Sequence, residues 1–308
     1  MGAYVVRRLL WTPILLLIVA LVTFILGVYG PGDPVEILQG QYNNPEVVER
    51  IREQRGLNHN VFIQFGTYVK NVVQGDLGES FKYQDRTVTE LIGKRIWVSA
   101  QLGLAATIIS LSLGIPLGVF AAMKQGTWID VTTVSITLVF MSLPVFITAP
   151  VLLIVFGLQL GILPVQGWGG FFDPHMVMPA MVMGVPGVAI ITRLTRASTL
   201  DVLSQDYVRT ARAKGLGELL VRRRHILRNA LIPVFTVVGL SLATLVEGSF
   251  ITEGFFGIPG IGSLAIEAFF SRDYPIITAL VLIIASAFVV ANLIVDIGYR
   301  FLDPRIRY

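Results

Sequence analysis

The sequence contains no cysteine, which excludes disulfide bonds, thiol nucleophiles and thiolate metal ligands. Histidine is scarce as well: His59, His175 and His225 lie far apart, and no HxxxH or HExxH spacing occurs. The phosphate-loop motif GxxxxGK[ST] is also missing, so this chain alone is not expected to bind and hydrolyse ATP through such a loop. We therefore expect no catalytic, metal-binding or cofactor-binding residues, and no enzyme activity, in this chain.

Charged residues are also few. Charged residues make up only 14% of the chain, against about a quarter in soluble domains, whereas 54% of residues are hydrophobic and the mean hydropathy is +0.72. A soluble fold of this size would have to bury too much apolar surface, so the composition predicts an integral membrane protein built of helices. The mild net charge of +4 fits basic loops on one side of a membrane better than nucleic-acid binding.

Long uncharged runs mark the expected membrane spans. A bilayer core needs about 20 helical residues. The uncharged run 131–172 is too long for one helix, and its Gly- and Pro-rich part, 157–170, predicts the end of a span and an external loop. The first apolar run is followed by PGDP rather than by a cleavage site, which favours a retained first span. We expect six spanning helices, at about residues 9–29, 97–122, 131–156, 177–196, 230–251 and 275–298.

Proline occurs inside several of these spans, for example at Pro116, Pro144, Pro150 and Pro186. Proline frees a backbone carbonyl, which must find a partner within the protein or in cavity water. Kinked helices around a cavity are one interpretation, and the general frequency of proline in spanning helices is the other. The prolines alone do not decide between the two.

Lysine and arginine are distributed unevenly between the connections. The connection 193–228 carries nine Lys/Arg residues, whereas 157–178 carries none. The positive-inside rule therefore predicts that the N terminus and the 193–228 connection face the cytoplasm. Six spans bring the basic C-terminal tail back to the same side, so we expect both termini to be cytoplasmic.

Residues 31–96 are the exception, because they hold eight Lys/Arg residues yet fall outside. They also hold nine Asp/Glu residues, and a segment of this length translocates largely regardless of charge. Capping and periodicity predict helices at 44–56 and within 60–75, and Thr87-Val-Thr-Glu90 has the spacing of a capping box. We therefore expect three parts: an N-terminal tail with the first span (1–30), a small extracytoplasmic helical domain (31–96), and a core transmembrane domain (97–308).

The stretch DYVRTARAKGLGELLVRRRHILRNALIP (206–233) is the most basic part of the chain. From Tyr207 to Arg228 it holds seven Lys/Arg residues and one acid. The part before Gly215 predicts a short helix, and a second helix is expected after Gly217. The sequence therefore predicts a compact helix–turn–helix element rather than an extended linker.

One face of the first short helix carries small residues. Tyr207, Ala211 and Gly215 recur every fourth position, so they share a face that another surface can approach closely. Anionic lipid headgroups would attract the cations, but they explain neither the small face nor the glycine break. A nucleic acid is disfavoured because no stacking platform accompanies the charge. A cytoplasmic protein with a groove is the remaining partner.

This stretch resembles the cytoplasmic loop of permease subunits of ATP-binding-cassette (ABC) importers. The family pattern is EAA, three residues, then Gly, and Arg209-Thr210-Ala211 and Gly215 match it here. Arg209 replaces the glutamate, and Arg228 stands where the general form has proline; both departures resemble the peptide/nickel branch, where the pattern ends HxLRNALIP. Nearly the whole chain is similar to that branch, including PGDP (31–34), GDLGES (75–80), TEGFFGIPGIG (252–262) and DPRIRY (303–308).

The resemblance implies the first (B-type) permease subunit of such an importer, with six transmembrane helices in the type I ABC importer fold. It implies a coupling loop, 198–229, whose short helix fits a groove on a separate ATPase. The implied contact residues are Tyr207, Arg209, Thr210, Ala211, Arg212, Lys214, Gly215 and Leu216.

The implied partners are a second, different permease chain, two cytoplasmic ABC ATPases that bind ATP and Mg, an extracytoplasmic substrate-binding protein and the lipid bilayer, but no nucleic acid. The implied location is the inner membrane of a bacterial or archaeal cell. The substrate stays open: peptides, nickel complexes, sugars and haem-like compounds are all compatible with the branch.

Five residues are weaker candidates for the translocation pathway or its gate. Glu247 is expected near the outer end of the fifth span, where it lines the outer mouth or is a plain interfacial acid. Glu253, Phe255 and Phe256 lie in a Gly-rich stretch that forms either a gate or an ordinary connector with interfacial aromatics. Asn292 is more suited to an interhelical hydrogen bond than to substrate contact.

Two other classes of protein are weighed against the importer subunit. A membrane-embedded enzyme would need clustered polar groups at one membrane depth, and the spans hold few. A stand-alone secondary transporter predicts two similar halves and ionisable residues near the midplane, and neither is evident. Neighbouring genes for ATPases and a secreted binding protein would favour the importer, and a lone reading frame the secondary transporter.

Overall fold

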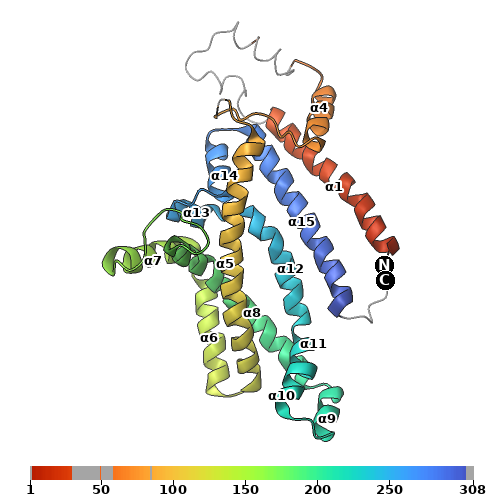
Figure 1. Ribbon diagram of the computed structural model, residues 1–308, viewed down its shortest axis with the longest axis vertical. Helices are drawn as coiled ribbons and strands as arrows, with labels where there is room; N and C mark the ends of the chain where they lie inside the picture. The colour runs from red at the N-terminus through yellow and green to blue at the C-terminus, as the bar shows by residue number, and fades with distance from the viewer. Residues whose placement is uncertain (1, 30–48, 50–57, 84, 303–308) are drawn as a thin grey trace.

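The computed structural model describes residues 2–29, 49, 58–83 and 85–302, and these residues fold almost entirely into helices (Figure 1). The only strand-like contact among them is an isolated bridge between Glu79 and Thr87. The helix expected at 44–56 and the motifs PGDP (31–34) and DPRIRY (303–308) lie outside the described residues. An all-helical membrane protein is thereby confirmed for the described part of the chain.

Four helices are long and apolar enough to cross a membrane: α1 (Gly2–Tyr29), α5 (Val88–Met123), α8 (Val177–Leu203) and α15 (Tyr274–Leu302). They correspond to the first, second, fourth and sixth expected spans. Figure 1 shows α1 beside α15 on one side of the molecule and α5 crossing α8 at its centre.

The third expected span, 131–156, is not one straight helix. The chain bends by 95° between Trp128–Ser142 (α6) and Val145–Gln159, which comprises α7 (Val145–Leu152) and the π-helix η1 (Leu153–Gln159). Pro144 explains the break, because it lacks an N–H and forces Leu143 out of the helical region, to φ −81° and ψ 116°. The described residues thus contain four spanning helices, or five if the bent pair counts as one.

The fifth expected span, 230–251, is shorter than predicted. Helix α12 covers Ile232–Glu247, and its 16 residues are fewer than the roughly 20 that a bilayer core requires. It ends because Gly248 adopts φ +72°, and Ser249 then caps a separate helix, α13 (Phe250–Phe256). The last residues assigned to this span by sequence therefore belong to the next helix.

The remaining helices are short and gather at the two ends of the molecule. They are α4 (Val61–Val73), η2 (Pro174–Met176), α9 (Asp206–Ala213), α10 (Glu218–Leu220), the π-helix η3 (Val221–Leu227), α11 (Arg228–Ala230) and α14 (Ile261–Phe270). In Figure 1, α9 and α10 form the lower end, and α4 and α14 lie at the upper end. The short basic helices α9 and α10 and the helix α14 are thus at opposite ends.

The central pair α5–α8 packs through glycines. A Cβ added to Gly118 in α5 would lie 2.6 Å from the backbone oxygen of Thr192 in α8, and one added to Gly184 in α8 would lie 2.9 Å from the backbone oxygen of Ala106. Small residues let two membrane helices approach closely, and van der Waals packing then holds them together. This close pair connects the core of the molecule to α9, because α8 leads directly into it.

Helix α5 begins as the capping pattern predicts. The Thr87 side chain accepts a hydrogen bond from the backbone N–H of Glu90 at 3.2 Å, and the helix then continues without interruption to Met123. The predicted division between residues 96 and 97 therefore falls inside a continuous helix.

Candidate functional site

The basic stretch forms the compact element that its sequence predicts. Helix α9 ends at Ala213, and Gly215 makes the turn with φ +76°, a left-handed conformation that favours glycine. Gly217 then caps α10, which continues as η3 and α11 into α12. Short π-helices are often found at functional sites, and η3 lies directly behind α9.

The first short helix packs against the second through a small apolar core. Val208 and Ala211 are buried against Val221 and Ile226, and all four are at most 4% exposed. Ala211 therefore faces the chain's own second helix and does not lie on an open face with Gly215, as the four-residue spacing had suggested. The buried face of α9 pairs Ala211 with Val208, whereas Tyr207 and Gly215, which the spacing had grouped with Ala211, are exposed.

Most other candidate contact residues are open to solvent. Tyr207 is 41% exposed and Leu216 36% exposed, and Arg209, Thr210, Arg212, Lys214 and Gly215 are exposed as well. The sequence reading missed two neighbours, Leu219 and Leu220, which are 66% and 46% exposed in α10. Together with Leu216, they add exposed apolar side chains to the candidate surface.

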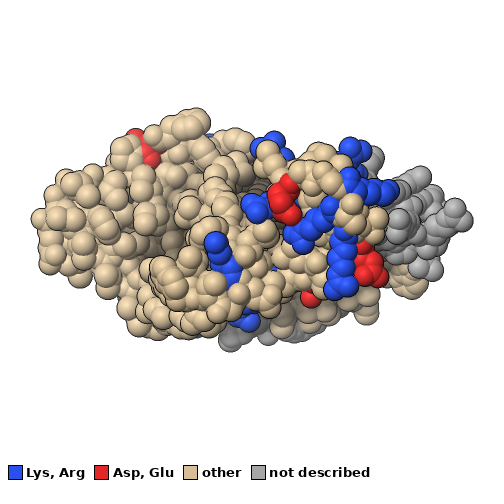
Figure 2. Space-filling model, turned by 90° about the horizontal axis from the view of Figure 1, so that it is seen from below, with Lys and Arg blue, Asp and Glu red and all other residues tan. Residues whose placement is uncertain are grey.

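Polar contacts hold the two short helices in one arrangement. Arg212 Nε donates to Glu218 Oε1 at 2.9 Å across the glycine turn, and Asn229 Nδ2 donates to the Tyr207 hydroxyl at 3.0 Å. The charge of Arg212 is thus partly balanced within the chain, whereas Lys214 makes no ion pair with any described residue. Viewed from this end, basic side chains gather on one part of the surface with a few acidic ones between them (Figure 2).

An ion pair that the sequence did not reveal fixes the lower part of α8. Arg196 donates through Nε to Asp130 Oδ1 at 2.6 Å, and the Gly126 N–H donates to Asp130 Oδ2 at 3.1 Å. Asp130 lies in the first turn of α6 and is 4% exposed. The pair joins the α5–α6 turn to α8, a few residues before α8 leads into α9. An acid at the start of one span and a cation inside another were the available signals.

The stretch TEGFFGIPGIG is organised around a buried carboxylate. Glu253 is 0% exposed and accepts hydrogen bonds from Ser99 Oγ at 2.7 Å, Ser263 N at 2.8 Å and Ser249 N at 3.3 Å. These donors come from α5, α14 and the start of α13. The carboxylate thus ties three elements together.

The other pathway candidates lie on α12, α13 and α15. Phe256 is 2% exposed and Phe255 is half-buried in the same apolar cluster. Glu247 is the last residue of α12. The Asn292 amide donates to the Phe288 carbonyl of its own helix at 2.8 Å, not to another helix as expected.

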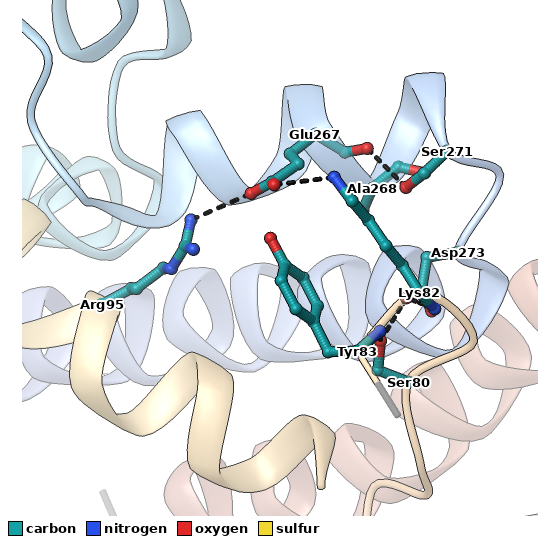
Figure 3. Close-up of polar contacts among 8 residues, drawn as sticks. All are labelled: Ser80, Lys82, Tyr83, Arg95, Glu267, Ala268, Ser271 and Asp273. Carbon is teal, nitrogen blue, oxygen red and sulfur yellow. Dashed lines mark hydrogen bonds and ion pairs between the residues drawn. The ribbon is translucent and has the colours of Figure 1, made fainter. Parts of the chain in front are cut away.

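At the opposite end, the segment after GDLGES is fastened to α14 (Figure 3). Lys82 Nζ lies 2.7 Å from Glu267 Oε1, and Arg95 lies 3.5 Å from Glu267 Oε2. The Ser80 hydroxyl and the Lys82 backbone N–H both donate to Oδ2 of buried Asp273. We call these five residues the α14 latch.

The latch alters the pKa of its two principal charges. Burial alone would raise the pKa of Glu267, but hydrogen bonds from Lys82 and Tyr83 and the nearby cations outweigh it, so the net pKa is lowered. The hydrogen bond to Glu267 raises the pKa of Lys82, against a smaller opposing effect of burial. Both shifts favour the charged forms that make the contact.

Comparisons with known proteins extend over the whole chain. Residues 114–308 match the family model described as "Binding-protein-dependent transport system inner membrane component", and residues 1–101 match the N-terminal model of the same type of membrane component. The chain is 36% identical to a probable peptide ABC transporter permease of Sinorhizobium fredii, with 100% of both chains covered.

Two further relatives also match over nearly the full length of the chain. The chain is 36% identical to a dipeptide transport system permease of Alkalihalophilus pseudofirmus, with 100% of both chains covered. It is 38% identical to a glutathione transport system permease of Escherichia coli, with 99% of both chains covered.

A solved structure, an inward-facing conformation of the MetNI methionine ABC transporter, has a similar fold. Its TM-score is 0.57 at 17% sequence identity, over 69% of this chain and 96% of that one. At this identity the likeness concerns the fold alone, and it confirms the expected type I importer permease architecture. The helical fold and the family matches together show that the chain belongs to the family of multi-pass inner-membrane permease subunits of binding-protein-dependent ABC importers.

Proposed function

We propose that this chain is the peptide-conducting permease subunit of its importer and that α9 is the helix through which a separate ATPase drives it. The observation that carries the proposal is the rigid α9–η3 element. It projects from one end of the molecule and joins α8 directly to α12. A partner that displaces α9 must therefore displace both core helices.

The surface of this element suits a protein groove. Tyr207, Thr210 and Leu216 are exposed on α9 and its turn, and Leu219 and Leu220 extend the apolar part of the surface. Lys214 adds a cation for an acid at the rim of a groove. Ala211 contributes indirectly, since its small side chain lets η3 pack closely behind α9.

The proposed mechanism is a two-state equilibrium biased by the partner. An ATPase that binds α9 more tightly in one state shifts the permease toward that state, by no more than the difference in binding free energy. The buried contacts of Val208 with Val221 and the Arg196–Asp130 pair would transmit the displacement to α8 and α6. ATP and Mg belong to the ATPase subunits in this scheme.

The proposed assembly follows from the family and the polarity of the chain. We place α9 and both termini in the cytoplasm because residues 207–228, which follow α8, carry seven Lys/Arg residues and one acid. The partners would be two ATPases, a second permease chain that completes the pathway, and an external binding protein. The coupling segment 198–229 and the external segment 31–96 would contact these partners from opposite sides.

Short peptides are the proposed substrate. The printed names of the relatives specify a peptide, a dipeptide and glutathione, which is itself a tripeptide. These names favour peptides over nickel complexes, sugars or haem-like compounds for this chain.

Gly215 offers the sharpest test of the coupling proposal. Gly215→Glu places a bulky anion at an exposed turn with φ +76°, whereas Gly215→Asn keeps a residue that tolerates this conformation. We expect binding-protein-stimulated ATP hydrolysis and peptide uptake to fall at least about tenfold with Glu and to be largely retained with Asn. Membrane insertion of both variants should equal that of the wild type.

The matched control is Gly161→Glu. Gly161 has φ +62°, is exposed and has nothing within 4 Å of an added Cβ, but lies in the loop after η1. This variant should keep coupled hydrolysis. Normal coupling in Gly215→Glu, or an equal loss in Gly161→Glu, would remove α9 from the coupling role.

A further inference from the structure

Apart from Arg196, the residues that line a groove between α6 and α8 have no role in the coupling proposal. Its cavity is about 520 Å³, within the range of about 300–1,000 Å³ typical of small-ligand sites. Its walls are mainly apolar, from Val134 and Met141 of α6 and Ile190 and Leu194 of α8. This volume suits a short peptide, and two arginines supply the only charges in its lining.

The two arginines of the groove, Arg193 and Arg196, differ in their electrostatic state. The Arg196 guanidinium is held by both oxygens of Asp130, so its charge is compensated. Arg193 lies three residues earlier on the same helix, is exposed, and makes no ion pair or side-chain hydrogen bond with the described part of the chain. The groove therefore presents one uncompensated cation beside an apolar wall.

The depth of Arg193 makes this cation unusual. It lies ten residues before Leu203, the end of α8, which corresponds to about 15 Å along the helix. Charged side chains inside membrane spans are costly, and they typically face a protein interior or a water-filled cavity on a substrate path. Compensation by a mobile anion would explain why no fixed acid accompanies Arg193.

We propose that the Arg193 guanidinium binds the C-terminal carboxylate of a peptide in transit, while the apolar wall of the α6–α8 groove accepts its side chains. Guanidinium and carboxylate match in planar, two-point geometry, which makes arginine the strongest side-chain partner for this group. This site rests on the proposed function and adds to it a required chemical feature of the substrate, a free carboxylate.

The test compares a peptide acid with its amide in the complete importer complex. Binding of trialanine and of trialanine amide is measured by calorimetry, without the binding protein, in phosphatidylcholine nanodiscs. Wild-type complex should prefer the acid. Arg193→Gln should lose about ten- to a hundredfold in affinity for the acid and keep its affinity for the amide. Arg193→Lys should recover part of the preference, and Lys124→Gln, which removes a cation outside the groove, should change neither affinity.

Each alternative has its own outcome. Equal binding of acid and amide by wild type, or an unchanged preference in Arg193→Gln, overturns the carboxylate site. If adding phosphatidylglycerol to the nanodiscs abolishes the acid preference, Arg193 binds a lipid phosphate instead. Uptake of trialanine by wild-type proteoliposomes with binding protein is measured in parallel. Uptake with no Arg193-dependent preference removes only this site, whereas no uptake removes the peptide function itself.

Discussion

The guanidinium of Arg196 in α8 donates two hydrogen bonds to the carboxylate of Asp130 in α6, from Nε at 2.6 Å and from Nη2 at 2.7 Å. The Asp130 side chain is 5% exposed and that of Arg196 is 27% exposed, so water screens the pair poorly. Two helices that flank the proposed groove are thereby fixed next to the start of the coupling element.

Removing one member of this pair should be costly. Asp130→Ala leaves a cation without its partner in a partly buried site, and we expect a loss of about 3 kcal/mol in the free energy of unfolding. The double variant Asp130→Ala/Arg196→Met should lose less than Asp130→Ala alone, because no unpaired charge remains. Thermal unfolding of the solubilised complex measures both.

An exposed ion pair supplies the control. Glu90 and Lys94 form an i,i+4 pair at 2.7 Å in α5, with side chains 48% and 68% exposed, so Glu90→Ala should leave the unfolding midpoint close to that of the wild type. Equal losses in Asp130→Ala and Glu90→Ala would show that the α6–α8 pair is no stronger than a surface contact.

The glycines of α5 predict a second contrast. A methyl group at Gly118 would meet the Thr192 oxygen at 2.6 Å, so Gly118→Ala should force α5 and α8 apart and cost about 1–3 kcal/mol. At Gly93 nothing lies within 4 Å, so Gly93→Ala should be neutral or stabilise the helix by up to about 1 kcal/mol. If Gly118→Ala and Gly93→Ala shifted the unfolding midpoint by the same amount, the close approach of α5 and α8 would be contradicted.

The short-range features were the ones the sequence predicted. Gly215 and Gly217 located the turn between the basic helices, and Thr87 located the start of α5, because glycine and capping preferences are set by the local backbone. Pro144 is visible in the sequence, but the sequence does not tell whether a proline kinks a helix slightly or breaks it by 95°. That depends on what packs around it.

Contacts between side chains far apart in the sequence could not be predicted from such local patterns. Asp130 and Arg196 are 66 positions apart, and Glu253 finds Ser99 across 154 positions. The four-residue spacing grouped Ala211 with Tyr207, but the folded chain buries Ala211 with Val208 against Val221 and leaves Tyr207 exposed. Local patterns identify which residues share a face, and tertiary packing decides what that face touches.

Glu253 yields a third prediction. Glu253→Ala would strip the acceptor from the Ser99 hydroxyl and from the Ser263 N–H, and leaving buried donors unpaired costs about 1–3 kcal/mol each. We expect a marked fall in the amount of folded protein in the membrane. Glu253→Gln keeps one oxygen and should be intermediate.

The neighbouring Gly254→Ala is the control, since nothing lies within 4 Å of its added methyl group. It should leave the yield of folded protein unchanged. Wild-type yield of Glu253→Ala, combined with a selective loss of transport, would return Glu253 to the role of a pathway or gate residue.

The α14 latch predicts a pH dependence of stability. The pKa of Glu267 is lowered in the folded protein, so its contribution to stability is complete above its usual value of 4.5 and is lost as the pH falls through the folded pKa. The pKa of Lys82 is raised, so its contribution is complete below 10.5 and is lost as the pH rises through the folded pKa. The contact should therefore be fully formed at neutral pH.

Because both side chains are about a third or more exposed, the stabilisation should be modest, about 0.2–1 kcal/mol at low salt. Glu267→Gln should lower the unfolding midpoint at pH 7, and its difference from wild type should shrink toward pH 3 and in high salt. Lys70→Met, which removes an exposed cation of α4 outside the latch, should show no such pH-dependent difference. A difference between Glu267→Gln and wild type that stayed constant from pH 7 to pH 3 would mean that Glu267 stabilises the latch through packing rather than through its charge.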